Sequence, residues 1–143
     1  MATDFRLTNA SNLIYRVGPT ATQAITSTTV YTYNLNSLPV GLYIANYQIN
    51  LINTNGVNGI YNITECRSQI TNTSTSTVIY HNTDTTTHPV PRASLQSYLG
   101  MTIINNTSVQ NYQFYLISYF TGTYQILSGS ASNSTYLQFT KIG

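Results

Sequence analysis

The chain has 143 residues, a formal net charge of +2 and 6% charged residues, against about 25% in an average soluble protein. This length fits one domain, and the five lysines and arginines are scattered, which excludes the basic cluster that nucleic acid binding needs. The neutral composition, rich in Asn, Ser, Thr and Tyr, argues against a freely diffusing cytoplasmic monomer. It favours a component of an assembled or extracellular particle.

The single cysteine, Cys66, rules out an internal disulfide framework. Since Cys66 lies within a strand-like segment, we interpret it as a small buried apolar side chain. The first ten residues lack the basic and apolar pattern of a signal peptide, and no apolar run approaches the ~18 residues of a membrane span. We expect no membrane insertion, and release from the cell by lysis or on a particle.

The predicted elements begin after a polar N-terminal arm, residues 1–11. Residues 12–17 predict a first short strand, which ends at a Gly-Pro pair. Residues 25–33, rich in Thr, Val, Ile and Tyr, predict a second strand with or without a bulge. Residues 42–52 alternate between apolar and polar side chains and are the clearest strand of the chain.

The next segment carries two turn signals, Asn55-Gly56 and Asn58-Gly59. Asn and Gly tolerate positive φ angles, so these pairs predict a hairpin in which residues 60–70 return beside residues 42–52. The inward face of residues 60–70 stays ambiguous, because both alternating sets mix apolar and polar side chains.

Three further segments precede the C-terminal third. Residues 78–81 predict a brief strand, and residues 82–92 predict the longest irregular segment, extended and exposed because it holds two X-Pro bonds. Residues 93–104 predict another strand, interrupted at Gly100.

Residues 109–121 are apolar or aromatic on both faces of an extended strand. An ordinary half-buried surface strand leaves every second residue polar, so we expect one face to meet the protein's own core and the other to meet a second subunit. A final short strand follows over residues 134–142. Both strands supply the candidate oligomer interface: Tyr112, Phe114, Tyr115, Ile117, Tyr119, Phe120, Leu137 and Phe139.

No segment shows a sustained 3.6-residue apolar period with caps at both ends. Seven to ten short strands separated by turn signals predict an all-β fold, an antiparallel sandwich or jelly roll. We place this domain at residues 12–143, after the arm at residues 1–11.

Two motifs resemble the jelly-roll head domains of the C1q/tumour-necrosis-factor-like family. Leu38-Pro-Val-Gly-Leu-Tyr resembles the family's L-x-x-G-x-Y motif at the start of a long strand, and residues 127–130 with 136–143 resemble its closing loop and strand. Similar short chains occur among viral fibre, spike and minor capsid proteins. The resemblance implies a compact homotrimer with aromatic residues near its axis, although this chain lacks the Gly-X-Y stalk of collagen-fused members.

The sequence offers few residues for catalysis or metal binding. His81, Asp84 and His88 share one polar segment, but their spacing matches no standard metal site. The only carboxylates are Asp4, Glu65 and Asp84, and no nucleophile-elbow motif accompanies them. We therefore expect a non-enzymatic protein without a cofactor or metal. Glu65 also lies two residues before Arg67, which predicts an ion pair on one strand face.

The leading hypothesis is a viral structural protein on the virion surface, a capsid-associated, spike or fibre-head component that assembles as a homotrimer and contacts other virion proteins. The alternative is a receptor-binding or glycan-binding head or adhesin module. Tyrosine rings pack on sugar C–H groups, while amides and hydroxyls bond the sugar hydroxyls, and the same residue types suit protein recognition. For most tyrosines, core or interface packing is the simpler interpretation.

Overall fold

The computed structural model describes residues 14–56, 59–128 and 133–143. These ranges contain no helix and eleven strands, where seven to ten were expected: β1 (Ile14–Val17), β2 (Gln23–Ile25), β3 (Val30–Leu38), β4 (Gly41–Asn53), β5 (Ile60–Asn72), β6 (Thr77–Asp84), β7 (His88–Pro91), β8 (Leu95–Asn106), β9 (Gln110–Phe120), β10 (Tyr124–Ile126) and β11 (Tyr136–Lys141). The predicted N-terminal arm, residues 1–11, lies outside the described residues.

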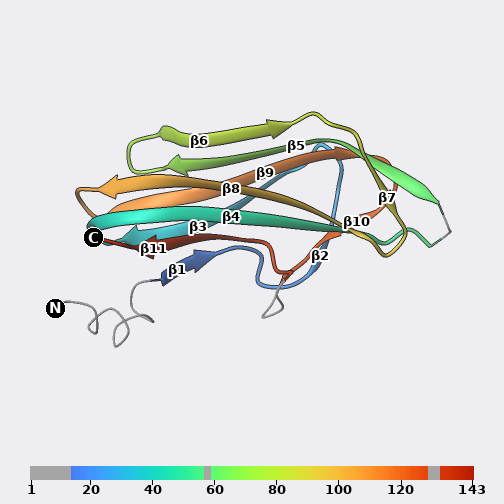
Figure 1. Ribbon diagram of the computed structural model, residues 1–143. Coiled ribbons are helices and arrows are strands. Elements are labelled where there is room, and N and C mark those ends of the chain that lie inside the picture. The colour runs from blue at the N-terminus through green and yellow to red at the C-terminus, as the bar shows by residue number, and fades with distance from the viewer. Residues whose placement is uncertain (1–13, 57–58, 129–132) are drawn as a thin grey trace.

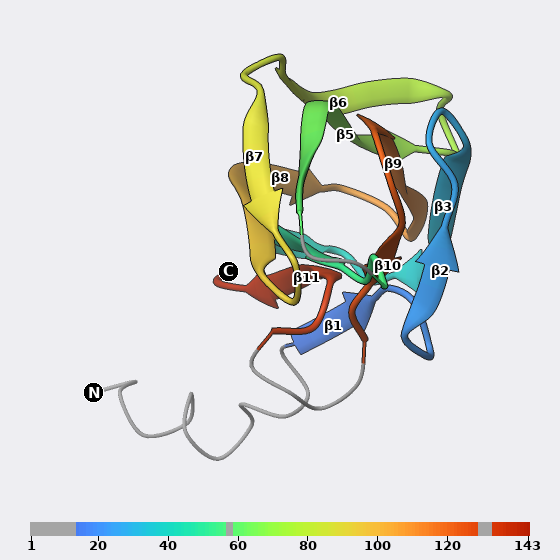
Figure 2. The same cartoon turned by 90° about the vertical axis from the view of Figure 1, so that its right-hand side faces the viewer.

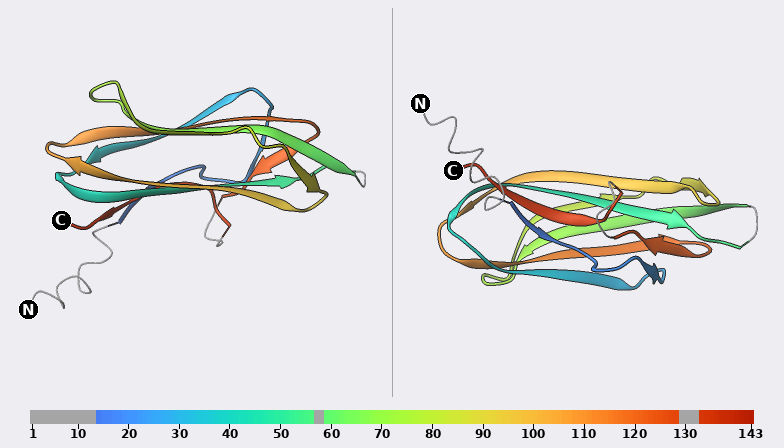
Figure 3. Two further views of the ribbon diagram at one scale, coloured as in Figure 1. Left: turned by 45° about the horizontal axis from the view of Figure 1, so that its top comes forward. Right: turned by 90° about the horizontal axis from the view of Figure 1, so that it is seen from below.

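The strands form two antiparallel sheets that face each other (Figures 1 and 2). In sheet A, β4 pairs with β8 along one edge and with β11 and β10 along the other, while β1 extends β11 and β2 extends β10. In sheet B, β9 lies between β3 and β5, and β5 also pairs with β6 and β7. The long strands of both layers follow the same long axis (Figure 3). The predicted antiparallel jelly-roll sandwich is confirmed.

The core fills the space between the two sheets. Alternate residues of β4 point into it, and they are at most 2% exposed: Tyr43, Ala45, Tyr47, Ile49 and Leu51. Aromatic rings join the layers, because Tyr47 of sheet A lies 5.4 Å from Phe114 of sheet B between ring centroids. The alternation predicted for residues 42–52 is therefore confirmed.

The predicted hairpin between residues 42–52 and 60–70 is wrong. β4 belongs to sheet A and β5 to sheet B, so their connection crosses from one layer to the other. Polar groups of the connection bond to other segments instead: the Thr54 N–H donates to the Thr123 carbonyl at 3.0 Å. The Asn55 side-chain carbonyl accepts from the Thr123 N–H at 3.1 Å. These long-range bonds hold Thr54 and Asn55 against residue 123, whereas Asn58 of the second Asn-Gly pair lies outside the described residues.

Part of the segment predicted to be irregular, residues 82–92, is strand. β6 continues to Asp84, and β7 pairs with β5 in the register Pro91 to Ile60 and Pro89 to Asn62. Proline lacks the N–H of a central strand but is tolerated at a sheet edge. Within the described ranges β7 pairs only with β5, so the missing N–H groups of the two prolines break no hydrogen bonds on its other edge.

β8 runs through Gly100 without the predicted interruption. A Cβ atom at this position would lie 2.2 Å from Cε1 of the Tyr47 ring. Only glycine therefore leaves room for this ring to pack against the β8 backbone. The glycine therefore serves side-chain packing rather than a break in the backbone.

Irregularities in two other strands explain what the sequence left open. A register shift between Ile63 and Glu65 changes which set of β5 side chains faces the core, so Ile63 and then Cys66 are both buried. Residues 25–33 divide between β2 of sheet A and β3 of sheet B, with Thr28 at φ 69° in the crossing.

Candidate functional site

The aromatic strand β9 lies in the middle of sheet B, between β3 and β5. Its alternate residues Phe114 and Leu116 are fully buried in the core. The other set, Tyr115, Ile117 and Tyr119, faces away from the core cluster on the outer side of the sheet. The prediction that one face of this strand packs in the protein's own core is confirmed.

The eight residues predicted for an oligomer interface fall into two groups. Four are at most 2% exposed within a single chain and fill its core: Tyr112, Phe114, Leu137 and Phe139. Ile117 is 6% exposed, and three residues remain partly accessible: Tyr115, Tyr119 and Phe120. The structure contains one chain, so contact with another copy stays a prediction, and this last group has the surface left to make it.

Beside β9, the outer face of sheet B carries an ion pair. The Arg67 guanidinium Nε donates to a Glu65 carboxylate oxygen, and Arg67 also lies 5.5 Å from the centre of the Tyr119 ring. The predicted Glu65–Arg67 pair is therefore confirmed. Because the Arg67 side chain is about half exposed, solvent screening keeps the energetic contribution of this pair small.

The three polar residues of the β6–β7 region do not come together. Asp84 Oδ2 lies 3.0 Å from His88 Nε2, and this hydrogen bond is the main cause that lowers the pKa of Asp84. His81 occupies the opposite face of β6, since it pairs with Gln69 while Asp84 pairs with Cys66. Among the residues with described positions, no group of three metal-ligating side chains forms.

The two described carboxylates are also separated. Glu65 and Asp84 lie on opposite faces of sheet B, because Asp84 is in register with Cys66, the residue after Glu65. They therefore do not form the facing pair that glycoside hydrolysis uses. Cys66 is buried and free, as predicted, and burial is the main cause that raises the pKa of its thiol to about 12.

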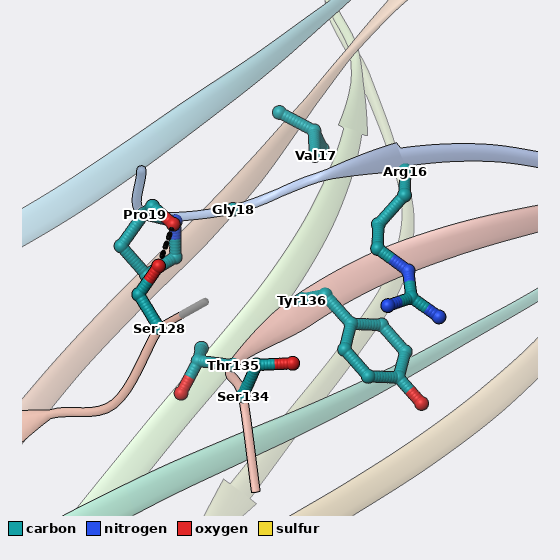
Figure 4. Close-up of a pocket in the computed structure, with 8 residues that line it drawn as sticks. All are labelled: Arg16, Val17, Gly18, Pro19, Ser128, Ser134, Thr135 and Tyr136. Carbon is teal, nitrogen blue, oxygen red and sulfur yellow. Dashed lines mark hydrogen bonds between the residues drawn. The ribbon is translucent and has the colours of Figure 1, made fainter. Parts of the chain in front are cut away.

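A small pocket of about 210 Å³ opens between β1, β11 and the segment before β11 (Figure 4). Arg16 lies over the Tyr136 ring at 4.0 Å and its Nε donates to Gln138 at 3.1 Å. The Ser128 hydroxyl donates to the Pro19 carbonyl. Drug-sized ligand sites have volumes of about 300–1,000 Å³, so this pocket is small, and its one charged group already has partners within the chain.

Among the described residues, three exposed apolar side chains lie on alternate positions of β8, on the outer face of sheet A. On β8, Leu99, Met101 and Ile103 are 69%, 65% and 67% exposed, while Tyr98 and Ile104 on the opposite side are buried. The sequence contains the signal, an alternation of two apolar sets. It does not show which set faces solvent, so the interface predicted from the sequence does not include these residues.

The described residues include no helix long and apolar enough to cross a lipid bilayer.

Comparisons with known proteins identify the fold but no sequence family. No family model matches the chain, and no curated protein matches it. Among solved structures it is similar to Eiger TNF of S. frugiperda, with a TM-score of 0.52 and 7% identity over 92% of each chain. It is also similar to a chain of the infectious bursal disease virus Gt strain, with a TM-score of 0.50 and 6% identity. That match covers 91% of this chain and only 38% of the viral chain. At such identities the likeness shows the fold alone, so this chain shares a jelly-roll fold with a TNF protein and a viral chain.

Proposed function

We propose that this chain is a non-enzymatic structural protein of a virion surface, which acts by assembling as a homotrimer and by contacting other virion proteins. The observation that carries the proposal is the outer face of sheet A, where Leu99, Met101 and Ile103 are each at least 65% exposed. Monomeric soluble proteins rarely leave large apolar side chains grouped in this way, and such groups mark interaction sites.

Two further observations support an assembly role over a catalytic one. The charged fraction of 6% leaves a surface with little charge repulsion between copies. The described carboxylates, Glu65 and Asp84, lie on opposite sheet faces, and the Cys66 thiol is buried. The fold likeness to a chain of infectious bursal disease virus supports the virion part of the proposal.

Size-exclusion chromatography with light scattering tests the assembly, and immunogold labelling of purified particles tests the location. We expect a mass of three chains and label on the particle surface. A protein that stays at the single-chain mass of 15.8 kDa at every concentration would remove the assembly. Particles without label would remove the virion location.

A second candidate function is a receptor-binding or glycan-binding head. The outer face of sheet B supports it, because Tyr115 and Tyr119 are partly exposed there beside Arg67, which lies against the Tyr119 ring. Aromatic faces and polar groups together suit sugars and protein partners. A glycan array probed with the wild type and with Tyr119→Ala tests this function. Binding that the substitution abolishes supports it, whereas a blank array at high protein concentration leaves the structural role.

A further inference from the structure

We propose that a second copy of this chain covers the outer face of sheet A, with the β8 residues Leu99, Met101 and Ile103 at the centre of the contact. This inference deepens the proposed function and rests on it, since it names the surface through which copies associate. It also places the contact on the opposite side of the sandwich from the aromatic strand β9.

The strand registers bring apolar residues of β8, β4 and β1 into one row. Ile103 lies opposite Ile44 on β4, Ile44 opposite Thr140 on β11, and Thr140 opposite Ile14 on β1. Ile14 is 46% exposed, so this row is apolar at both ends and reaches solvent. It crosses four neighbouring strands of the sheet.

The next two rows begin with Met101 and Leu99 and continue through uncharged groups. Met101 is in register with Asn46, and Leu99 with Gln48. Where these rows reach β11 and β1, they end in Gln138, Tyr136 and Arg16. The face is therefore apolar toward β8 and amide-rich toward its middle, which is the composition of many protein interfaces that exclude charge from their centre.

The size of this face fits a protein contact. Neighbouring strands lie about 4.8 Å apart and rise about 3.4 Å per residue, so four strands over six residues present about 400 Å² in flat projection. Side-chain relief raises the accessible area above this value, toward the roughly 800 Å² per partner of a standard interface. The largest apolar patch of a typical monomer covers about 300–600 Å², and this face falls within that range when its amide groups are included.

The charges and the strand edge favour a second copy over other partners. Arg16 is the one charged side chain in these three rows, and Tyr136 and Gln138 already engage it, so the face offers no pattern for an anionic partner. Within the described part of the chain, β8 pairs with β4 alone, and residues 95–106 contain no charge and no proline to protect the open edge. A second copy supplies uncharged surface of the same composition, and in a trimer the β8 face of each copy meets a different surface of the next copy.

The test compares lysine substitutions on the proposed face with a lysine substitution on sheet B at a residue of matching exposure. Ile103→Lys, alone and with Met101→Lys, changes the proposed face, and Ile60→Lys changes a sheet B residue that is 65% exposed against 67% for Ile103. A lysine on this face buries an unpaired charge in an apolar contact, so we expect association to weaken roughly 100-fold or more. Light scattering should then give one chain for Ile103→Lys/Met101→Lys and the wild-type assembly for Ile60→Lys.

Because all three side chains are mostly exposed in one chain, the variants should fold, and far-ultraviolet circular dichroism checks this. An assembly that survives Ile103→Lys/Met101→Lys but dissociates with Tyr119→Ala would overturn the inference and keep the proposed function, with β9 as the interface. A wild-type protein that is monomeric at every concentration would overturn both. A wild-type monomer that co-sediments with phosphatidylcholine vesicles would also overturn the inference, since the face would then be a membrane contact.

Discussion

Gly100→Ala tests the packing at the centre of the sandwich. A Cβ atom at residue 100 would lie 2.2 Å from Cε1 and 2.6 Å from the hydroxyl oxygen of Tyr47, far inside van der Waals contact. The Tyr47 ring has little room to move, because it is 2% exposed and lies 5.9 Å from the Tyr80 ring and 5.4 Å from the Phe114 ring. Moving it also breaks the 2.6 Å hydrogen bond that the Ser68 hydroxyl donates to the Tyr47 hydroxyl.

Overpacking of this kind costs about 1–3 kcal/mol, and the lost hydrogen bond about 1 kcal/mol. We therefore expect Gly100→Ala to lower the free energy of unfolding by about 2–4 kcal/mol, which for a chain of this size corresponds to a fall of about 6–12 °C in Tm. Differential scanning calorimetry and urea unfolding measure both quantities.

The matched control is Gly56→Ala, where a Cβ atom meets nothing within 4 Å. It should change Tm by no more than about 2 °C, in either direction. In a Tyr47→Leu background, the added cost of Gly100→Ala should shrink, because the clashing ring atoms are gone. A Gly100→Ala protein with the wild-type Tm would refute the packing described for β8 and β4.

Three further predictions concern buried polar groups. Asn106→Ala should lower the free energy of unfolding by about 2–4 kcal/mol in urea titrations. The Asn106 amide donates to the Leu38 and Pro39 carbonyls at 2.9 and 2.8 Å, and its oxygen accepts from the Tyr112 hydroxyl at 2.9 Å. An unchanged urea midpoint would contradict this prediction. Burial raises the pKa of Tyr47 and Tyr124 to about 12. Folding therefore favours their protonated forms, so their contribution to stability should be complete below about pH 10 and lost as the pH rises to about 12. Urea midpoints that do not fall over this interval would argue against it. Cys66 should resist a thiol reagent at pH 8 until urea unfolds the chain, and rapid native labelling would show that the core opens there.

The elements that the sequence predicts well are those with a single regular alternation. β4 is the clearest case, because its apolar set faces one core along its whole length. β5 was ambiguous because the register shift after Ile63 changes the inward set within one strand. The short strand β10 was missed because a strand of three residues carries almost no period.

The errors arose where a local signal depends on distant contacts. Asn-Gly pairs indicate a hairpin only if the flanking strands pair, and here β4 and β5 pair with other strands. Gly100 indicates a strand break from the sequence alone, because the sequence does not show that the Tyr47 ring packs against this glycine. The candidate interface shows the same limit, because the sequence reveals that Leu99, Met101 and Ile103 are apolar but not that β8 turns them outward.

The pairing of β1 with β11 has a consequence for biosynthesis. Ile14 to Val17 find their strand partner only in residues 137–140, and β4 pairs with β8, β10 and β11. A ribosome must therefore synthesise residues up to 140 before β1 can pair, and up to 106 and 126 before β4 can pair with β8 and β10. Topologies dominated by such distant pairings fold slowly. Until residues 136–141 are made, β4 lacks its β11 ladder and β1 lacks its partner, so the yield of the protein in a cell should depend on temperature and on chaperones.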